Sequence, residues 1–293
     1  MVLERVPLRL AQISDIHCGT GSFSGDVMES IVERITAMAP DLVVVAGDLS
    51  TEGYDWEFEE AKGWLDQIDL PKVFIPGNHD ARNVGYVHFE RYFGERQWRY
   101  RRAFDDERGE RLQATGYTVV GVDSSEPDIN DGEVGIDRYG WIGEQYDEPA
   151  DIRIFVVHHH LVSIPGSGRE RNIVTDAGDL LAHLIHLDVD LILSGHKHVP
   201  FFWGLNGMLI CNSGTATTKR VRGLVPPSWN EIIIDASTIK VYTHYIDRRR
   251  ELSVLFSRKT RALTREAFFL TEDYRRSNPV FMGLLPSSVA SGG

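Results

Sequence analysis

The sequence is poor in cysteine, in positive charge and in long apolar runs, and each shortage excludes a class of protein. Only Cys18 and Cys211 occur among 293 residues, which excludes a disulfide framework and favours a reducing compartment. No stretch approaches the ~20 apolar residues of a membrane-spanning helix, and the N-terminus carries no apolar run of signal-peptide length. We therefore expect a soluble, cytoplasmic protein with no membrane span.

The charge balance narrows the range of partners. Asp and Glu number 43 against 31 Lys and Arg, so the formal net charge is −12. General affinity for nucleic acid or anionic membrane needs a basic surface, which this composition does not supply. A phosphorylated substrate remains compatible, because bound cations can outweigh the surface charge locally. We therefore expect no general nucleic-acid binding, and the charge does not exclude a phosphorylated substrate.

Short apolar runs alternate with amphipathic segments along most of the chain, which is typical of α/β proteins. The run DLVVVA at 41–46 predicts a buried strand, and one-sided apolar spacing predicts a helix at 26–38. The segment 89–113 is rich in arginine and aromatic residues and gives no clear assignment. Further strands are expected at 8–13, 72–75, 117–122, 152–157, 190–193, 208–211, 231–234 and 239–245, the last three antiparallel, and helices at 57–68, 137–146 and 177–187.

The composition changes near residue 247, beyond which arginines become frequent. We predict a catalytic domain over 1–247 and a C-terminal extension over 248–293 whose last residues, 286–293, are disordered. The extension could be an arm that packs on the core or a lid over the substrate. Its arginines are also compatible with a dimer arm, which leaves a homodimer open.

Five polar motifs each follow a predicted strand directly. Ligands of α/β sheets bind outside the carboxyl ends of strands, where loops from several strands can aim side chains at one point. Asp, His and Asn dominate these motifs, and they suit divalent manganese, iron, cobalt or zinc. The motifs are Asp15-Ile16-His17, Gly47-Asp48, Gly77-Asn78-His79-Asp80, His158-His159-His160 and Gly195-His196-Lys197-His198.

The number of candidate ligands indicates two metal ions. One ion needs only three or four protein ligands, whereas the motifs offer seven. Two divalent ions ~3.5–4 Å apart form a clamp for phosphoryl displacement. Their mutual repulsion requires a bridging anion, and the carboxylate of Asp48 is the candidate. Glycines at 47, 77 and 195 would let the backbone turn tightly and approach the ions.

As a set, and in this order, the motifs resemble the calcineurin-like metallophosphoesterase superfamily, whose pattern is D-x-H, G-D, G-N-H-D/E, a strand-end H and G-H-x-H. The resemblance extends over residues 8–247 and includes the Asn212-Ser213-Gly214-Thr215 stretch. It implies an α/β fold, the four-layer αββα sandwich of two mixed sheets flanked by helices. It also implies two divalent cations (Mn, Fe, Co or Zn) and attack of a metal-bound hydroxide on a phosphoester.

The resemblance also implies a role for each residue. Asp48 would bridge the ions, and His79 would stabilise or protonate the leaving oxygen. Apart from the resemblance, Asp80 is expected to orient His79 rather than to bind metal, because carboxylates commonly pair with imidazoles beside metal sites. The first ion would be bound by Asp15, His17 and His198, and the second by Asn78, His158 and His196.

The fourth motif departs from the family. Many bacterial relatives read His-His-Pro, whereas this chain reads His158-His159-His160-Leu161. The first histidine after the strand is the usual ligand, which favours His158 and leaves its two neighbours as alternatives. Cys18 could serve as a soft ligand, although a small buried thiol is the better interpretation. Arg82, just after the third motif, should lie near the mouth of the site.

Spacing and size are most similar to the bacterial class III cyclic-nucleotide and glycerophosphodiester phosphodiesterase group, which implies a small phosphodiester substrate. A phosphomonoesterase and a nucleotide-sugar pyrophosphatase stay open as alternatives. A DNA-repair nuclease is disfavoured by the acidic composition, and a catalytically silent scaffold by the intact motifs. The basic cluster Arg96, Arg99, Arg101 and Arg102 could clamp a phosphate, although a solvated helix face or ion pairs with carboxylates at 105–107 are favoured.

Overall fold

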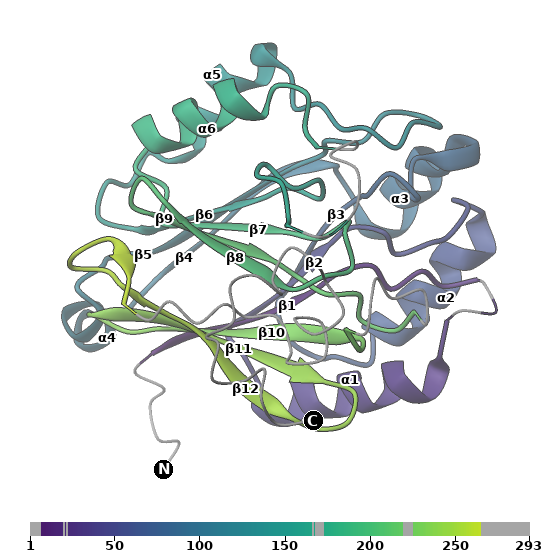
Figure 1. Ribbon diagram of the computed structural model, residues 1–293, viewed down its shortest axis with the longest axis horizontal. Coiled ribbons are helices and arrows are strands. Elements are labelled where there is room, and N and C mark those ends of the chain that lie inside the picture. The colour runs from purple at the N-terminus through teal and green to yellow at the C-terminus, as the bar shows by residue number, and fades with distance from the viewer. Residues whose placement is uncertain are drawn as a thin grey trace, which may run out of the picture.

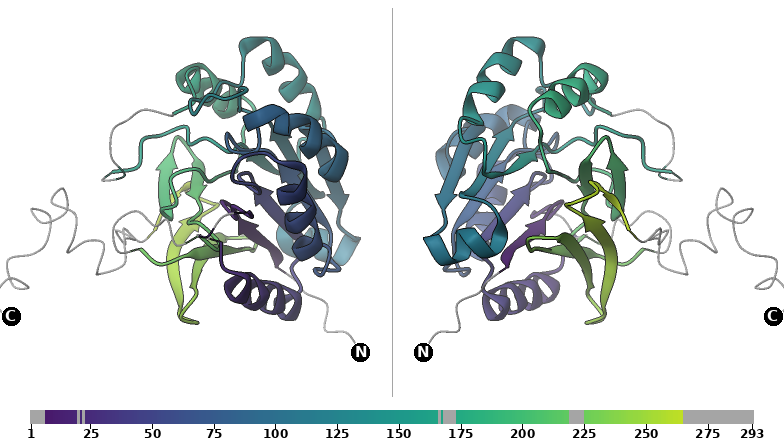
Figure 2. Two further views of the ribbon diagram at one scale, coloured as in Figure 1. Left: turned by 90° about the vertical axis from the view of Figure 1, so that its right-hand side faces the viewer. Right: turned by 90° about the vertical axis from the view of Figure 1, so that its left-hand side faces the viewer.

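Two mixed β-sheets lie face to face, and helices cover both outer faces (Figures 1 and 2). The computed structural model describes residues 7–19, 21, 23–165, 167, 173–218 and 225–264. The predicted disorder at 286–293 therefore lies outside the described residues. Among the helices of the described part, none is long and apolar enough to cross a membrane.

The first sheet has seven strands in the order β13-β12-β11-β10-β1-β2-β3. The three strands at one side, β1, β2 and β3, run parallel, so their carboxyl ends share one edge. The remaining strands join antiparallel. The strands are β1 (Leu8–Ile13), β2 (Leu42–Ala46), β3 (Lys72–Ile75), β10 (Ser228–Ile234), β11 (Thr238–Tyr245), β12 (Arg250–Ser257) and β13 (Ala262–Leu263).

The second sheet has six strands in the order β4-β5-β6-β7-β9-β8. Its four central strands are parallel, and β4 and β8 close the two edges antiparallel. The prediction of an antiparallel strand at 208–211 thus holds for its pairing with β8 but not for its pairing with β7. The strands are β4 (Gln97–Ala103), β5 (Gly116–Val122), β6 (Ile152–Val156), β7 (Leu191–Ser194), β8 (Phe201–Leu205) and β9 (Met208–Asn212).

Successive side chains of a strand point to opposite faces of its sheet, so one strand contributes to two layers of the core. In β2, Leu42, Val44 and Ala46 join the core between the sheets, while Val43 and Val45 join the core under the helices. Continuous apolar runs are typical of strands that are covered on both faces. This confirms the αββα sandwich.

Helices pack on the outer faces of the sheets. They are α1 (Gly25–Met38), α2 (Asp55–Leu65) and α3 (Gly85–Phe93) on the first sheet, and α5 (Tyr139–Gln145) and α6 (Ala177–His186) on the second. The remaining helices are α4 (Asp106–Leu112) and the short η1 (Arg82–Val84) and η2 (Ile136–Arg138).

The segment without an assignment, 89–113, contains the end of α3, the edge strand β4 and helix α4. Strand β8 was also not predicted, although the chain carries a signal for it. Asn206 and Gly207 join β8 to β9 with φ values of 44° and 87°, and Asn-Gly is the preferred pair for such a hairpin turn.

The first sheet continues past residue 247, where the predicted catalytic domain ends. Strand β12 pairs with β11 along its length, and β13 pairs with β12, so residues 250–263 belong to the first sheet. Val254 and Phe256, two positions apart on β12, both lie in the core between the sheets, a pattern that the surrounding arginines obscured. Residues 265–293 of the predicted extension lie outside the described part.

Glu231 ties three strands of the first sheet together and gives a stability prediction. It accepts hydrogen bonds from His244 Nε2 and Arg250 Nε, both at 2.9 Å. Burial alone would raise its pKa, but these bonds outweigh burial and lower the pKa to about 2. A lowered carboxyl pKa stabilises the fold above the unfolded value of 4.5, and this contribution is lost as pH falls towards 2.

Glu231→Gln is therefore expected to lower the melting temperature at pH 7 and to flatten its decline between pH 5 and pH 2, because the variant has no carboxyl group to protonate. Thermal unfolding of both proteins across this pH range measures the effect. Parallel curves for the two proteins would contradict the assignment.

Candidate metal centre

The loops that follow β1, β2, β3, β6 and β7 meet at one edge of the two sheets. Backbone hydrogen bonds hold them together: Asp15 N–H donates to Gly47 O at 3.0 Å, and Gly195 N–H donates to His158 O at 2.9 Å. Motifs as distant in sequence as those of Asp15 and His196, 181 positions apart, are therefore side by side in the structure.

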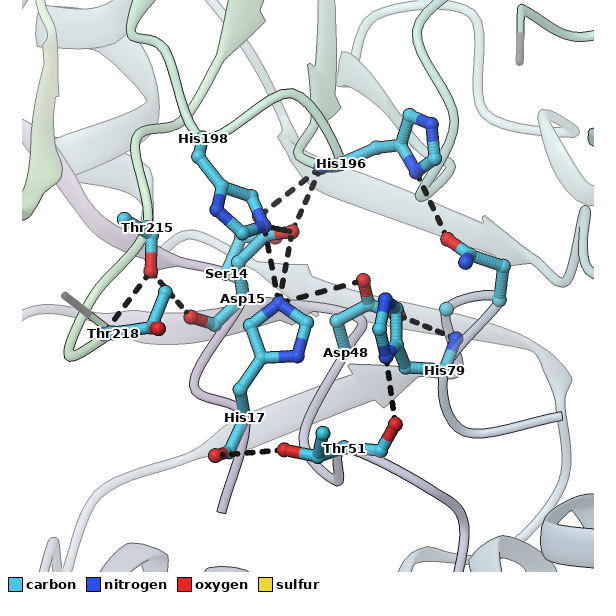
Figure 3. Close-up of polar contacts among 12 residues, drawn as sticks. Ser14, Asp15, His17, Asp48, Thr51, His79, His196, His198, Thr215 and Thr218 are labelled. Atoms are coloured by element: carbon cyan, nitrogen blue, oxygen red, sulfur yellow. Dashed lines mark hydrogen bonds and ion pairs between the residues drawn. The ribbon is translucent and has the colours of Figure 1, made fainter. Parts of the chain in front are cut away.

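The first cluster consists of Asp15, His17 and His198. His198 Nε2 lies 3.1 Å from His17 Nε2 and 3.3 Å from Asp15 Oδ1. Figure 3 shows the two rings and the carboxylate pointing toward one another. One carboxylate oxygen and two imidazole nitrogens at this spacing could hold one divalent cation.

The second cluster consists of Asp48, Asn78, His158 and His196. Asp48 Oδ2 lies 3.3 Å from His158 Nε2, and Asn78 Oδ1 lies 2.9 Å from His196 Nδ1. His158 Nδ1–H donates to Ala46 O at 2.7 Å, which fixes the ring with Nε2 toward the cluster. The donor set again suits one divalent cation.

Asp48 belongs to the second cluster, and one of its oxygens also faces the first. Its Oδ2 lies 3.3 Å from His158 Nε2 in one cluster and 3.8 Å from His17 Nε2 in the other. Its other oxygen, Oδ1, accepts a hydrogen bond from His79 N–H at 2.9 Å. The backbone of the third motif therefore orients the carboxylate, and Oδ2 occupies the position of a shared ligand.

The backbone of these loops is strained in a way that the sequence does not reveal. Non-glycine residues with φ in the left-handed region are uncommon, and each costs on the order of 1–3 kcal/mol. Such strain persists only where surrounding contacts impose it, and it gathers at functional sites. Five candidate ligands adopt it: Asp15 (φ 55°), His17 (53°), Asp48 (54°), His196 (73°) and His198 (59°).

Glycines make this convergence sterically feasible, as predicted. A Cβ at Gly47, whose φ is 89°, would lie 2.4 Å from His158 Nδ1. A Cβ at Gly77 would lie 2.2 Å from Asp48 Oδ1. The close approach of both loops thus depends on the missing side chains.

Gly77→Ala is expected to displace Asp48 and so to lower both metal content and melting temperature, because the clash involves a buried carboxylate and its own backbone. Elemental analysis and thermal unfolding measure the two effects. Gly63→Ala in α2 is the control, since a Cβ there meets nothing within 4 Å. Alanine should stabilise that helix by about 0.5–1 kcal/mol. Equal behaviour of the two variants would contradict the role of Gly77.

The electrostatics of the site reflect the neutral imidazoles of His17 and His196 around an ionised Asp48. Burial lowers the pKa of His17 to about 3 and that of His196 well below its ordinary value, so both rings are neutral with a lone pair available. Burial alone would lower the pKa of His158 as well, but the charge of Asp48 outweighs it and raises the pKa to about 10. Burial would raise the pKa of Asp48, yet His158 holds it well below the ordinary range. The carboxylate thus attracts positive charge to this position.

The three histidines of the fourth motif have different surroundings. His158 faces Asp48, with its Nε2 3.3 Å from Asp48 Oδ2. His159 uses both ring nitrogens elsewhere: Nδ1 accepts from Ser124 Oγ at 2.7 Å, and Nε2–H donates to Asn130 O at 3.2 Å. The ring of His160 stacks on that of His196 with centroids 5.8 Å apart. This geometry favours His158 as the ligand.

His79 lies beside the first cluster, with its ring edge-on to His17 at a centroid distance of 4.6 Å. Its Nδ1–H donates to Thr51 O at 2.7 Å, and Arg82 Nη2 lies 3.4 Å from its Nε2 (Figure 3 shows the Thr51 contact). Arg82 is therefore close to the site, as expected from its position after the third motif.

Asp80 does not orient His79, contrary to the sequence-based prediction. Its Oδ1 accepts from Ser50 N–H at 2.8 Å and from Ser50 Oγ–H at 2.7 Å, and its Oδ2 accepts from Leu49 N–H at 3.1 Å and Gly77 N–H at 2.9 Å. The physical reason is burial: a fully buried carboxylate takes the nearest backbone donors. Asp80 thus fixes the loop that carries Asp48.

Two further predictions concern groups outside the clusters. Cys18 is buried and is not a member of either cluster in the described part of the chain. Arg99 and Arg101 lie in strand β4 rather than on a helix, and they and Arg96 pair with carboxylates, but not with those at 105–107. Arg96 contacts Glu90 and Asp123, Arg99 contacts Asp147, and Arg101 contacts Asp151.

Some contributors to the site carry no sequence signal. Thr215 Oγ1 donates to Asp15 O at 2.7 Å and Thr217 Oγ1 donates to Ile16 O at 2.5 Å, which support the first loop. Asn130, on the connection between β5 and η2, accepts hydrogen bonds from Asn78 and His159 at the second cluster's periphery without belonging to any motif. Only the family-like stretch at 212–215 pointed to one of these residues, Thr215.

Comparison with known proteins gives a consistent result. A probable cyclic nucleotide phosphodiesterase of Synechococcus sp. is 23% identical over 259 residues, which cover 83% of this chain and 94% of that protein. A probable glycerophosphodiester phosphodiesterase, GpdQ, of Arcobacter nitrofigilis is 29% identical, with 74% and 69% covered. The crystal structure of a dimetal phosphatase from Danio rerio has the same fold, with a TM-score of 0.62, 10% identity and coverage of 80% and 95%. Residues 8–200 match the family described as calcineurin-like phosphoesterase, and the chain belongs to that family.

Proposed function

We propose that this chain hydrolyses small phosphodiesters, with cyclic nucleotides as the leading candidates, by using two divalent cations to activate water. Family membership makes the chain a phosphoric ester hydrolase. The observation that carries the two-cation proposal is the position of Asp48 Oδ2, within 4 Å of a histidine nitrogen in each cluster. One shared anionic ligand between two donor sets is the arrangement that a pair of cations requires.

The two donor sets would divide the ligands between the cations. Asp48 would be shared, and its anionic charge would offset part of the repulsion between the ions. When bound, such a pair lowers the pKa of water toward neutrality and neutralises charge on a phosphoryl group. The first ion would be held by Asp15, His17 and His198, and the second by Asn78, His158 and His196.

His79 would serve the leaving group. The hydrogen bond from Nδ1 to Thr51 O fixes the ring beside the first cluster and leaves Nε2 as the atom that can hold or deliver a proton. A positioned histidine of this kind can stabilise or protonate the departing oxygen.

His79→Ala is expected to reduce turnover by about 10²–10⁴-fold while both cations stay bound, because general acid catalysis contributes on that scale and the ring is not among the proposed ligands. Turnover and metal content, measured on the same preparation, check this. Loss of a cation would show instead that His79 is a ligand, which its position near His17 and Asp48 makes a meaningful alternative.

Two observations support a diester rather than a monoester. Two dications less the charges of Asp15, Asp48 and one hydroxide leave about +1, which suits the single charge of a diester. The relatives from Synechococcus and Arcobacter bear phosphodiesterase names. The monoesterase and nucleotide-sugar pyrophosphatase alternatives would use the same site.

A substrate panel tests the proposal. It compares cyclic nucleotides, glycerophosphodiesters and bis(p-nitrophenyl) phosphate with p-nitrophenyl phosphate, nucleotide sugars and single-stranded DNA, each with manganese, iron, cobalt or zinc. We expect two metal ions per chain and higher kcat/KM for diesters than for matched monoesters. Preference for monoesters would redirect the proposal to a phosphomonoesterase. Absence of both bound metal and hydrolysis would indicate a silent scaffold.

A further inference from the structure

Asn130 touches three residues of the candidate site, although it comes from a loop that belongs to no motif. Its side-chain oxygen Oδ1 accepts from Asn78 Nδ2 at 3.2 Å and from Arg82 Nη2 at 3.3 Å. Its backbone oxygen accepts from His159 Nε2–H at 3.2 Å. Asn130 thus links a proposed ligand of the second cation to the arginine beside His79.

These contacts determine which way the Asn78 amide points. A guanidinium can only donate hydrogen bonds, so the group that Asn130 presents to Arg82 must be its oxygen. That oxygen also faces Asn78, which must therefore turn its NH₂ group toward Asn130. The Asn78 oxygen is then directed to the second cluster, where it lies 2.9 Å from His196 Nδ1.

The direction of this amide matters for a cation. Amide oxygen is a ligand for divalent ions, whereas the NH₂ group presents positive hydrogens and would repel them. A half-turn of the Asn78 side chain would exchange the two groups at almost no steric cost. The hydrogen bond to Asn130 opposes this half-turn, together with the contact to His196 Nδ1.

The loop that carries Asn130 is itself held in place at several points. Ser124 Oγ contacts the same His159 ring at 2.7 Å, and Asp128 Oδ1 accepts from Asn83 N–H at 3.1 Å. Asn130 is on the surface, so its side chain can be changed without opening the core. It is therefore a fixed acceptor at the rim of the second cluster.

We propose that Asn130 is a positioning residue for the second cation: by fixing the amide of Asn78, it presents that oxygen to the ion. This inference rests on the proposed two-cation function. Loss of a group that orients a metal ligand typically weakens metal binding by about 10–100-fold.

The test uses the full chain and Mn²⁺, without substrate. Equilibrium dialysis with elemental analysis gives the dissociation constants of both ions, and electron paramagnetic resonance distinguishes a coupled manganese pair from an isolated ion. Asn130→Ala removes the acceptor, and Asn130→Asp keeps an acceptor oxygen in the same place. Asp128→Ala is the matched control, because it removes a hydrogen bond of the same loop that does not involve a proposed ligand.

We expect Asn130→Ala to raise the Kd of the second Mn²⁺ by about 10–100-fold and to weaken the coupled-pair signal, with the first Kd changed less than about threefold. Asn130→Asp and Asp128→Ala should retain both ions with near wild-type constants.

If Asn130→Ala binds both ions as tightly as the wild-type chain does, this inference is wrong, and the proposed function is unaffected. Equal weakening by Asn130→Ala and Asp128→Ala would also overturn the inference, because the loop as a whole would then be responsible. A wild-type chain that binds no pair of ions would overturn the proposed function, and this inference with it.

Discussion

Asp48→Ala is expected to release both metal ions and to reduce turnover by at least ~10³-fold. Two dications ~4 Å apart repel each other by on the order of 20 kcal/mol at an effective dielectric of ~20. The carboxylate whose Oδ2 faces both clusters is the protein anion placed to offset that repulsion. Alanine removes this charge. Among the proposed ligands, Asp15 in the first cluster is then the one remaining carboxylate.

Metal content and turnover, measured on Asp48→Ala, check this expectation. Asp151→Asn is the control, since Asp151 is also a buried carboxylate but bonds Arg101, Thr115 and Thr118 rather than any proposed ligand. It should reduce stability and leave both ions bound. An Asp48→Ala protein that retains two ions would refute the shared-ligand assignment.

His158→Ala is the second substitution with a large expected effect. It should empty the second site selectively and lower turnover by at least ~100-fold, because a catalytic metal supplies several kcal/mol of charge stabilisation. The first cluster does not include His158, so one ion should remain. Elemental analysis after dialysis, together with turnover, measures both consequences.

His159→Ala provides the matched comparison within the same motif. Its ring nitrogens engage Ser124 and Asn130, so its loss should leave Nε2 of His158 facing Asp48. We expect two bound ions in this variant and at most a moderate loss of turnover. If His159→Ala empties the second site and His158→Ala does not, the fourth ligand is misassigned.

The sequence predicted most of the fold, because the apolar patterning of its central elements is strong. The run at 41–46 is buried on both faces, and the helix at 26–38 has one apolar side, so both were located to within one residue. Segment 89–113 was not assigned, because its edge strand β4 is half exposed and lacks a clear alternation. Strand β12 was not predicted either, because the arginines around it hid its short apolar stretch.

The sequence predicted which residues converge at the strand ends. It did not predict the hydrogen bonds that hold these residues in place. Motif order located the residues that converge, since parallel strands bring their carboxyl ends to one edge. The sequence could not reveal that Asp80 would bond the backbone of the second motif, since this depends on loop packing. Nor could it reveal the contact of Asn130 with Asn78, which joins residues 52 positions apart.

A crystal structure of the chain with Mn²⁺, with anomalous diffraction data, tests the central claim most directly. The account predicts two anomalous peaks ~3.5–4 Å apart on either side of Asp48 Oδ2, one beside His17 and His198 and the other beside Asn78 and His158. A single peak, or peaks that do not share Asp48 as a ligand, would contradict it.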